Sequence, residues 1–206
     1  MGREEIWVRW AMELQSLAQA GLFYGKDVFD RERYTRIREI SAEMLAHMTD
    51  LPVEKVTGVF CNEVGYQTPK LDTRAAVFQE GKILLVKERS GKWALPGGWC
   101  DVGLSVGENT CKEVKEEAGL DVVPEKVIAV QDRAKHNKPD YAYSICKIFV
   151  QCRLLGGEFT KNSETSEARF YAPDELPELA GEKNTAEQVR LCFEAYRDEN
   201  WKTLLD

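Results

Sequence analysis

The sequence predicts an α/β fold in which helices cover a mixed β-sheet, preceded by a small all-helical domain. Apolar residues recur at helical spacing up to about Val64. Beyond the breaker-rich segment 65–69, short apolar runs typical of strands alternate with helical patterns. We therefore expect a helical domain over residues 1–66 and an α/β domain over residues 67–206.

The helical domain is expected to contain three short amphipathic helices. The residues that define them recur at three- and four-residue steps, in three sets: Trp7, Trp10, Leu14 and Leu17; Tyr34, Ile37, Ser41, Met44 and Met48; and Val53, Val56 and Phe60. A segment of this size has little core of its own, so these faces should rest on the larger domain or on a second subunit. Its tryptophan, methionine and tyrosine content favours a homodimer.

Strand and helix patterns alternate in the second domain. Residues 74–78 and 82–86 are apolar runs joined by Gln79-Glu80-Gly81, which is typical of a hairpin. Further strands are predicted at 92–95, 127–131, 144–155 and 168–171, with Gly156-Gly157 turning the chain before the last of them. A turn of helix at 173–176 and a final helix at 185–197 complete the pattern.

One helix carries its own start and stop signals. Ser105 followed three residues later by Glu108 forms a capping box, so the helix should begin near Val106. Gly119 can adopt the left-handed conformation that ends helices, so the helix should stop at about Ala118.

Three carboxylates lie on one side of this helix. Glu113, Glu116 and Glu117 occupy positions i, i+3 and i+4, and like charges so close together favour a cation among them. Mg²⁺ prefers oxygen ligands and binds substrate phosphates, so it fits best. The alternative is a solvated helix face. The preceding turn, Pro96-Gly97-Gly98, brings bare backbone close to the helix and favours the functional interpretation.

This stretch resembles the signature box of the Nudix hydrolases, G-x5-E-x7-R-E-U-x-E-E-x-G-U, in which U is aliphatic. Gly98 takes the place of the first glycine, and residues 112–120 match the second half. Leu104 stands where the family has its first Glu, and Lys112 stands where it has Arg. In the family these two residues are thought to steady the loop and to orient the following Glu, whereas the later carboxylates, which bind the metal, all survive here. We therefore interpret the box as a variant with retained chemistry.

The resemblance implies an α/β/α sandwich and Mg²⁺-dependent attack by water on phosphorus, with Mn²⁺ as a possible substitute. It implies that the metal ligands are Glu113, Glu116, Glu117 and the Gly97 carbonyl, and Glu116 and Glu117 are also catalytic candidates. In several family members a glutamate from a late loop completes the site. Here Glu164 and Glu167 occupy that region, although each could equally be a solvated acid.

Substrate contacts are expected from basic and aromatic side chains near the predicted strand ends. The basic segment 132–139 is well placed for phosphate binding, and a solvated hairpin is the alternative. Tyr141 could stack on a base or belong to the core. The candidate substrate-binding residues are Arg74, Lys87, Arg89, Arg133, Lys135, His136 and Tyr141.

The formal net charge of −7 argues against non-specific binding to nucleic acid or anionic membranes. With neither a long apolar run nor a signal-peptide core, a cytoplasmic protein is expected, with a nucleotide as its small-molecule substrate and no DNA or membrane partner.

Four features extend the resemblance over essentially the whole chain: the box with Leu104, the segment Asp132-Arg133-Ala134-Lys135-His136, the segment Thr165-Ser166-Glu167 and the N-terminal helical extension. Together they resemble the Nudix subgroup that includes CDP-choline pyrophosphatase, many of whose members are labelled ADP-ribose pyrophosphatases. This resemblance implies cleavage of a nucleoside diphosphate linked to a small moiety, with CDP-choline the first choice and ADP-ribose the second. The alternatives are processing of RNA ends or short RNA, and a nucleotide-binding regulator without turnover.

Overall fold

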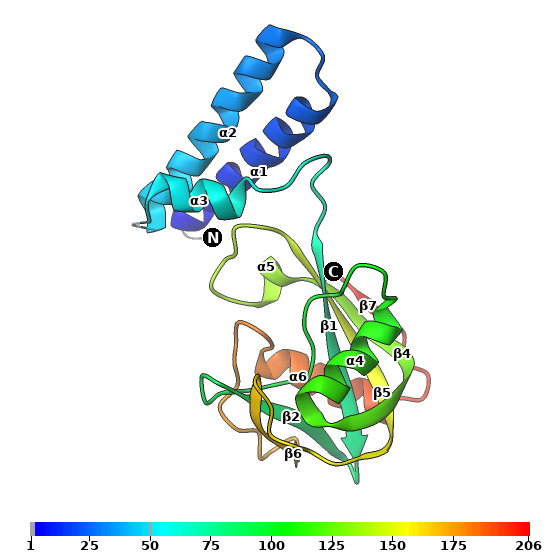
Figure 1. Ribbon diagram of the computed structural model, residues 1–206. Coiled ribbons are helices and arrows are strands. Elements are labelled where there is room, and N and C mark those ends of the chain that lie inside the picture. Colours follow the sequence, from blue (N-terminus) through cyan, green and yellow to red (C-terminus); the bar gives the residue numbers. More distant parts are fainter. Residues whose placement is uncertain (1–2, 50) are drawn as a thin grey trace. The chain divides into compact units, whose positions relative to one another are not determined.

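The computed structural model describes residues 3–49 and 51–206, and the chain divides into two compact units (Figure 1). The helical unit comprises Met1–Pro69 with Asp140–Ser144, and the sheet unit comprises Lys70–Pro139 with Ile145–Asp206. This division falls three residues after the boundary expected from the sequence. No helix in the described ranges is long and apolar enough to cross a membrane.

Three helices form the helical unit, as predicted. They are α1 (Arg3–Tyr24), α2 (Val28–Thr49) and α3 (Val53–Phe60). The first two have 22 residues each, so they are longer than the short helices that the sequence suggested. Gly21 lets α1 approach α2 closely, because a Cβ at this position would lie 2.5 Å from the ring of Tyr34.

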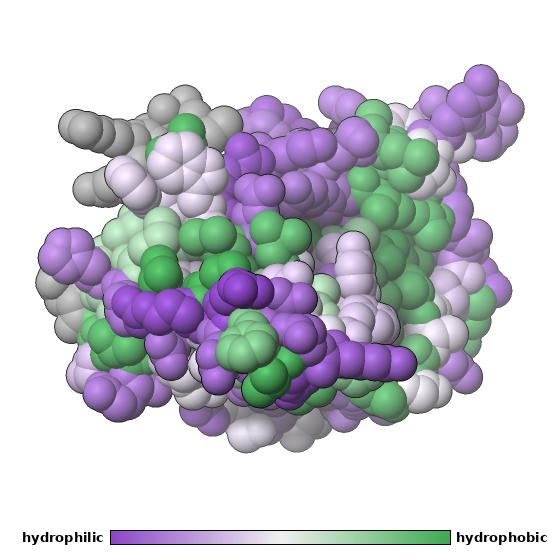
Figure 2. All heavy atoms as spheres, turned by 90° about the horizontal axis from the view of Figure 1, so that it is seen from above, coloured by the Kyte–Doolittle hydropathy of each residue, from purple (hydrophilic) through white to green (hydrophobic). Residues whose placement is uncertain are grey.

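The side chains of α1 that are buried in the helical unit are small or polar. Ala11 and Ala18 are buried, and so are Gln15 and Gln19, whose side chains hydrogen-bond to each other. Several large apolar residues of α1 are exposed. The exposed fractions of Trp7, Trp10 and Leu17 are 44%, 46% and 58%. Figure 2 shows hydrophobic surface lying open beside hydrophilic side chains.

The sheet unit contains a seven-stranded mixed sheet, which confirms the predicted fold class. Its order is β3-β2-β1-β5-β4-β7, and β6 pairs with β2. The pairs β1·β5 and β4·β7 are parallel, and the other pairs are antiparallel. The strands are β1 (Lys70–Gln79), β2 (Lys82–Glu88), β3 (Trp93–Ala94), β4 (Leu120–Asp132), β5 (Ile145–Gly157), β6 (Thr165–Tyr171) and β7 (Leu204–Leu205).

The predicted hairpin joins β1 to β2. Gln79 pairs with Lys82, which leaves a two-residue turn of Glu80 and Gly81. Both turn residues have positive φ, 51° and 75°, as a type I′ turn requires. This turn type follows the right-handed twist of the strands and fixes their register.

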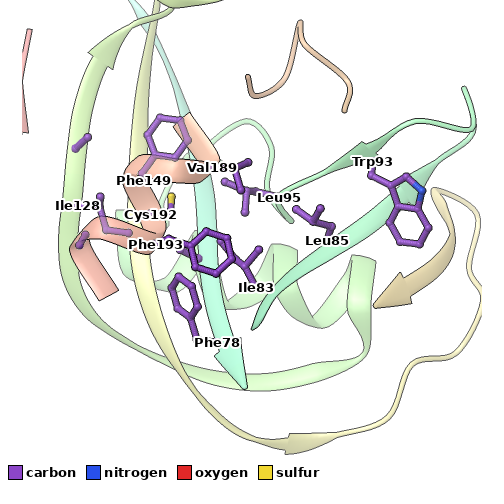
Figure 3. Close-up of a cluster of buried hydrophobic side chains, with 13 residues drawn as sticks. Phe78, Ile83, Leu85, Trp93, Leu95, Ile128, Phe149, Val189, Cys192 and Phe193 are labelled. Atoms are coloured by element: carbon purple, nitrogen blue, oxygen red, sulfur yellow. The ribbon is translucent and has the colours of Figure 1, made fainter. Parts of the chain in front are cut away.

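Helices α4 (Val106–Ala118) and α6 (Ala186–Arg197) cover opposite faces of the sheet. Because side chains alternate along a strand, Ala76 and Phe78 of β1 pack in the cluster that contains α6. Ala75 and Val77 pack in the cluster that contains α4. Figure 3 shows the α6 cluster, in which side chains of α6 point at the sheet. The unit is the expected α/β/α sandwich.

Two predictions about local structure are wrong. Gly156 and Gly157 do not turn the chain but lie in β5, where they pair with the start of β4. Gly157 is needed there because a Cβ would lie 2.5 Å from the carbonyl oxygen of Gly119. Residues 173–176 form an irregular turn rather than a turn of helix, with the Glu175 N–H donating to the Ala172 carbonyl.

The segment after β4 also differs from prediction. Instead of a loop, it starts with a one-turn helix, α5 (Arg133–His136). The Asp132 carboxylate caps this turn by accepting a hydrogen bond of 3.0 Å from the Ala134 N–H.

Candidate active site

Helix α4 begins and ends where the sequence predicts. Ser105 is the N-cap, and both hydrogen bonds of the capping box with Glu108 are present. Gly119 is the C-cap, with φ of 70° in the left-handed region. The side chain of Asn162 donates to the Glu116 carbonyl at 2.8 Å, and the Thr165 hydroxyl donates to the Glu117 carbonyl at 2.6 Å. The chain that leads into β6 is therefore attached to the last turn of α4.

The glycine turn contacts the glutamate face of α4. The Gly97 N–H donates to Oε2 of Glu117 at 2.9 Å. A Cβ at Gly98 would lie 2.9 Å from Oε2 of Glu113. Gly97 has φ of 145°, and a Cβ there would lie 1.9 Å from the Thr73 carbonyl oxygen. Glycines at these positions thus allow bare backbone to approach both carboxylates.

The three glutamates have different environments. Glu113 and Glu117 are buried, with exposed fractions of 8% and 4%, whereas the Glu116 side chain is 54% exposed. Burial raises the pKa of Glu117 to about 7, although the Gly97 N–H and the Arg74 charge oppose this rise. Burial also raises the pKa of Glu113, against the opposing effect of Lys112.

Lys112 joins the acidic groups at the solvent side of the site. Its Nζ lies 3.1 Å from Oδ2 of Asp101, 3.4 Å from Oε1 of Glu113 and 3.0 Å from Oε2 of Glu116. Hydrogen bonds to Glu116 and Asp101 raise the pKa of Lys112. Asp101 was not predicted as part of the site. It provides a carboxylate partner for Lys112, whereas Leu104, at the position where the family has Glu, has no carboxylate.

A buried ionic cluster lies behind Glu117. Arg74, predicted as a substrate-binding residue, is 5% exposed and makes a two-pronged contact with Asp72 at 2.8 and 3.2 Å. Nζ of Lys147 lies 2.5 Å from the same carboxylate, and burial lowers the pKa of Lys147 to about 8. The positive charge of Arg74 is close enough to lower the pKa of Glu117. Asp72 and Lys147 were missed, although Lys147 is flanked by apolar residues within the strand predicted at 144–155, which was a signal that could have found it.

Two further charged residues near Glu117 come from distant segments. Lys183 forms an ion pair of 2.5 Å with Glu88, and these two charges shift the pKa of Glu117 in opposite directions. The segment that carries Lys183 is fixed beside β3, because the Leu95 N–H donates to the Asn184 side chain at 2.8 Å. No local pattern in the sequence indicated this pairing.

The late-loop acids are arranged differently from each other. Glu167 lies on β6, where its carboxylate pairs with Lys87 at 2.9 Å and Arg169 at 2.5 Å. The hydrogen bond from Lys87 is the main cause of its lowered pKa. Glu164 is exposed, in the loop whose Ser163 carbonyl accepts a hydrogen bond of 2.6 Å from Arg89. Lys87 and Arg89 are therefore engaged with this loop and β6.

The basic segment after β4 contributes mainly to packing. Arg133 is buried, and its Nη1 donates to the Pro139 carbonyl at 2.8 Å. Nε2 of His136 lies 2.7 Å from Oδ1 of Asp206 near the end of the chain, and Lys135 is exposed. Tyr141 belongs to the residues that group with the helical unit, where its ring lies 5.8 Å from that of Tyr143.

The donor set suits a hard divalent cation, but it is not complete by itself. In residues 3–49 and 51–206 no three His, Cys, Asp or Glu side chains converge as a metal cluster. The carbonyls of Pro96 and Gly98 accept hydrogen bonds from β1. Within the described chain, the Gly97 carbonyl takes no part in this ladder. Buried carboxylate oxygens beside a backbone carbonyl fit Mg²⁺, which retains water and binds substrate phosphates.

A cavity of about 410 Å³ lies elsewhere in the sheet unit. Phe78 and Tyr196, whose rings are stacked at 4.1 Å, line it with the ion pair of Glu125 and Arg153. None of the predicted site residues lines this cavity.

Comparison with known proteins gives matches for both units. Residues 68–192 match the NUDIX domain, and residues 5–60 match a domain described as UDP-X-like, N-terminal oligomerisation domain. YjhB of Bacillus subtilis (strain 168), whose name assigns it provisionally to the ADP-ribose pyrophosphatases, is 43% identical over 97% of both chains.

Many solved structures are similar to this chain, among them the two that follow. The crystal structure of a UDP-X diphosphatase is 34% identical, covers 98% of this chain and 100% of its own, and has a TM-score of 0.64. An ADP-ribose pyrophosphatase from Streptococcus suis 89-1591 is 58% identical, covers 68% of this chain and 100% of its own, and also has a TM-score of 0.64. With its capped glutamate helix and glycine turn on an α/β/α sandwich, the chain belongs to the Nudix hydrolases.

Proposed function

We propose that this chain is a Mg²⁺-dependent pyrophosphohydrolase that cleaves a nucleoside diphosphate linked to a small alcohol or sugar. The products would be a nucleoside monophosphate and a phosphorylated partner. The observation that carries the proposal is the pair of buried carboxylates, Glu113 and Glu117, held against the backbone of the glycine turn. Buried charge of this kind is costly unless a cation compensates it.

Glu113 and Glu117 would hold the metal, together with Glu116 and the Gly97 carbonyl. When bound, Mg²⁺ would lower the pKa of the attacking water and neutralise charge on the phosphoryl oxygens. The Gly97 N–H orients Glu117 through its hydrogen bond of 2.9 Å. Arg74 keeps a fixed positive charge near Glu117, because its contact with Asp72 prevents it from swinging away.

Glu164 is the better of the two late-loop candidates for the base. It is exposed, and its loop is attached to the last turn of α4 through Asn162. Glu167 is already neutralised by Lys87 and Arg169. Glu164→Gln should lower kcat far more than it changes KM if Glu164 is the base. Glu167→Gln is the matched comparison.

The small moiety is the open part of the proposal. The subgroup resemblance favours CDP-choline, and the names of two similar proteins favour ADP-ribose. The name of a third similar protein refers to a UDP-linked substrate. A panel of CDP-choline, ADP-ribose and UDP-glucose, assayed for monophosphate release with Mg²⁺, with Mn²⁺ and with EDTA, would decide. If no member released a monophosphate in a metal-dependent way, the proposal would fail.

The helical unit is proposed to form a homodimer. Its match to an oligomerisation domain supports this, as do the exposed fractions of Trp7 and Trp10, which are 44% and 46%. Aromatic side chains are enriched at subunit interfaces, where their burial contributes most of the binding free energy.

A further inference from the structure

The ammonium group of Lys112 forms ion pairs with three carboxylates. Its Nζ lies between 3.0 and 3.4 Å from the side chains of Asp101, Glu113 and Glu116. A lysine ammonium has three N–H donors, so each carboxylate can receive one. Two of these carboxylates belong to the proposed metal site, and the third does not.

The position of Asp101 is fixed by the protein interior. Its N–H donates to Oδ1 of Asn109 at 3.0 Å, and Asn109 in turn donates to the Thr73 hydroxyl at 2.9 Å. Both Asn109 and Thr73 are fully buried. The Asp101 backbone is therefore tied to α4 and β1, although its side chain is 55% exposed.

A lysine between Glu113 and Glu116 competes with any divalent cation for the same oxygens. Asp101 gives the ammonium a partner outside the metal site, so Lys112 can release the glutamates without losing every ion pair. If Asp101 were neutral, Lys112 would retain only Glu113 and Glu116 as partners and would compete more strongly.

We propose that Asp101 is a positioning residue, which holds Lys112 at the edge of the site and so leaves Glu113 and Glu116 available to the catalytic metal. This inference rests on the proposed function, because it assigns a purpose to Asp101 only if a divalent cation binds these glutamates. Asp101 acts through Lys112 and touches neither metal nor substrate.

The test is the Mg²⁺ affinity of the full-length chain without substrate, measured by titration calorimetry. Asp101→Asn keeps the backbone hydrogen bond to Asn109 but removes the charge. It should weaken Mg²⁺ binding by roughly tenfold, as is usual when a residue that supports metal ligands is lost. Since Asp101 acts through Lys112, the same substitution in a Lys112→Met background should change the affinity less than about twofold, because no coupling remains when the shared partner is absent.

Asp121→Asn is the matched control. The Asp121 carboxylate pairs with Lys115 of the same helix at 2.9 Å, and its side chain is 56% exposed. Losing this ion pair should leave the Mg²⁺ affinity unchanged. An Asp101→Asn chain with wild-type affinity would overturn the inference, and so would an equal loss with and without Lys112.

The outcome can be separated from that of the proposed function. A wild-type chain that binds Mg²⁺ and shows the Asp101 effect, but hydrolyses no nucleotide, would refute the proposed activity and leave the positioning role intact. A chain that hydrolyses nucleotides, with the same Mg²⁺ affinity in Asp101→Asn, would refute only the positioning role. If the wild-type chain bound no divalent cation, both would be wrong.

Discussion

Replacing Glu117 with glutamine should stabilise the metal-free protein at alkaline pH. The Glu117 side chain is almost fully buried, and burial raises its pKa from 4.5 to about 7. Because the folded carboxyl group holds its proton more tightly than the unfolded one, it favours folding fully below pH 4.5. This contribution is lost as the pH rises through about 7. The gap between the two pKa values corresponds to about 3 kcal/mol.

Glutamine keeps an oxygen acceptor for the Gly97 N–H but never ionises. In EDTA, the free energy of unfolding of Glu117→Gln should therefore be similar to that of the wild type near pH 4.5 and exceed it by up to about 3 kcal/mol at pH 8. Urea denaturation at four or five pH values measures this difference directly. Added Mg²⁺ should then stabilise the wild type at pH 8 and not the variant, because the cation favours the ionised carboxylate.

Glu116→Gln is the control for this experiment. Glu116 lies on the same helix face, but its side chain is 54% exposed and paired with Lys112. Its substitution should give no comparable gain in stability between pH 5 and pH 8. If the free energy of unfolding of Glu117→Gln differed from that of the wild type by the same amount at every pH in this range, the conclusion that burial raises the pKa of Glu117 would be wrong.

Three other predictions concern the turn, the loop and the helical unit. Gly97→Ala should destabilise the fold by about 3 kcal/mol or more in urea denaturation, because the new Cβ would lie 1.9 Å from a backbone oxygen of β1. Gly103→Ala is the comparison for this substitution. Gly103 has φ of 91° but open space around it, so the alanine should lower the free energy of unfolding by only about 1 kcal/mol. Asn162→Ala should cost about 1 to 2 kcal/mol in the same assay, since its amide bonds the end of α4, and unchanged stability would contradict that role. Trp7→Ser combined with Trp10→Ser should convert a dimer to monomers in sedimentation analysis, and a wild-type monomer would refute the dimer.

Structural features that depend on residues close together in the sequence could be predicted from it. The bounds of α4 follow from Ser105, Glu108 and Gly119, which satisfy the orphaned backbone groups of the helix ends whatever the rest of the chain does. The presence of the hairpin follows from its short connection in the same way, although the sequence placed Gln79 in the turn and the structure pairs it with Lys82. Such signals need no tertiary information, because the hydrogen bonds they make are local.

Contacts between distant segments could not be predicted in this way. Glu88 and Lys183 are 95 residues apart, and the local sequence around each is typical of an ordinary surface charge. Their meeting depends on the chain after β6 returning to β3. The same holds for Asp101, because nothing in the box pattern associated this residue with Lys112. The glutamates could be assigned to one face, but the raised pKa values of Glu113 and Glu117 depend on burial, which the helical spacing alone does not determine.

The charges around α4 explain why a cation and a diphosphate should bind together. Ion pairs, or effects on the pKa of Glu113 or Glu117, connect ten ionisable groups: Asp72, Glu88, Asp101, Glu113, Glu116 and Glu117 with Arg74, Lys112, Lys147 and Lys183. When all are ionised, two negative charges remain in excess. Burial raises the pKa of Glu117 to about 7 and so favours the protonated form of this carboxyl group in the metal-free site. One Mg²⁺ would balance the protein's own groups and release that proton. A diphosphate adds further negative charge and therefore requires cations beside it. Because a bound cation attracts the diphosphate and a bound diphosphate attracts cations, each ligand lowers the electrostatic cost of binding the other.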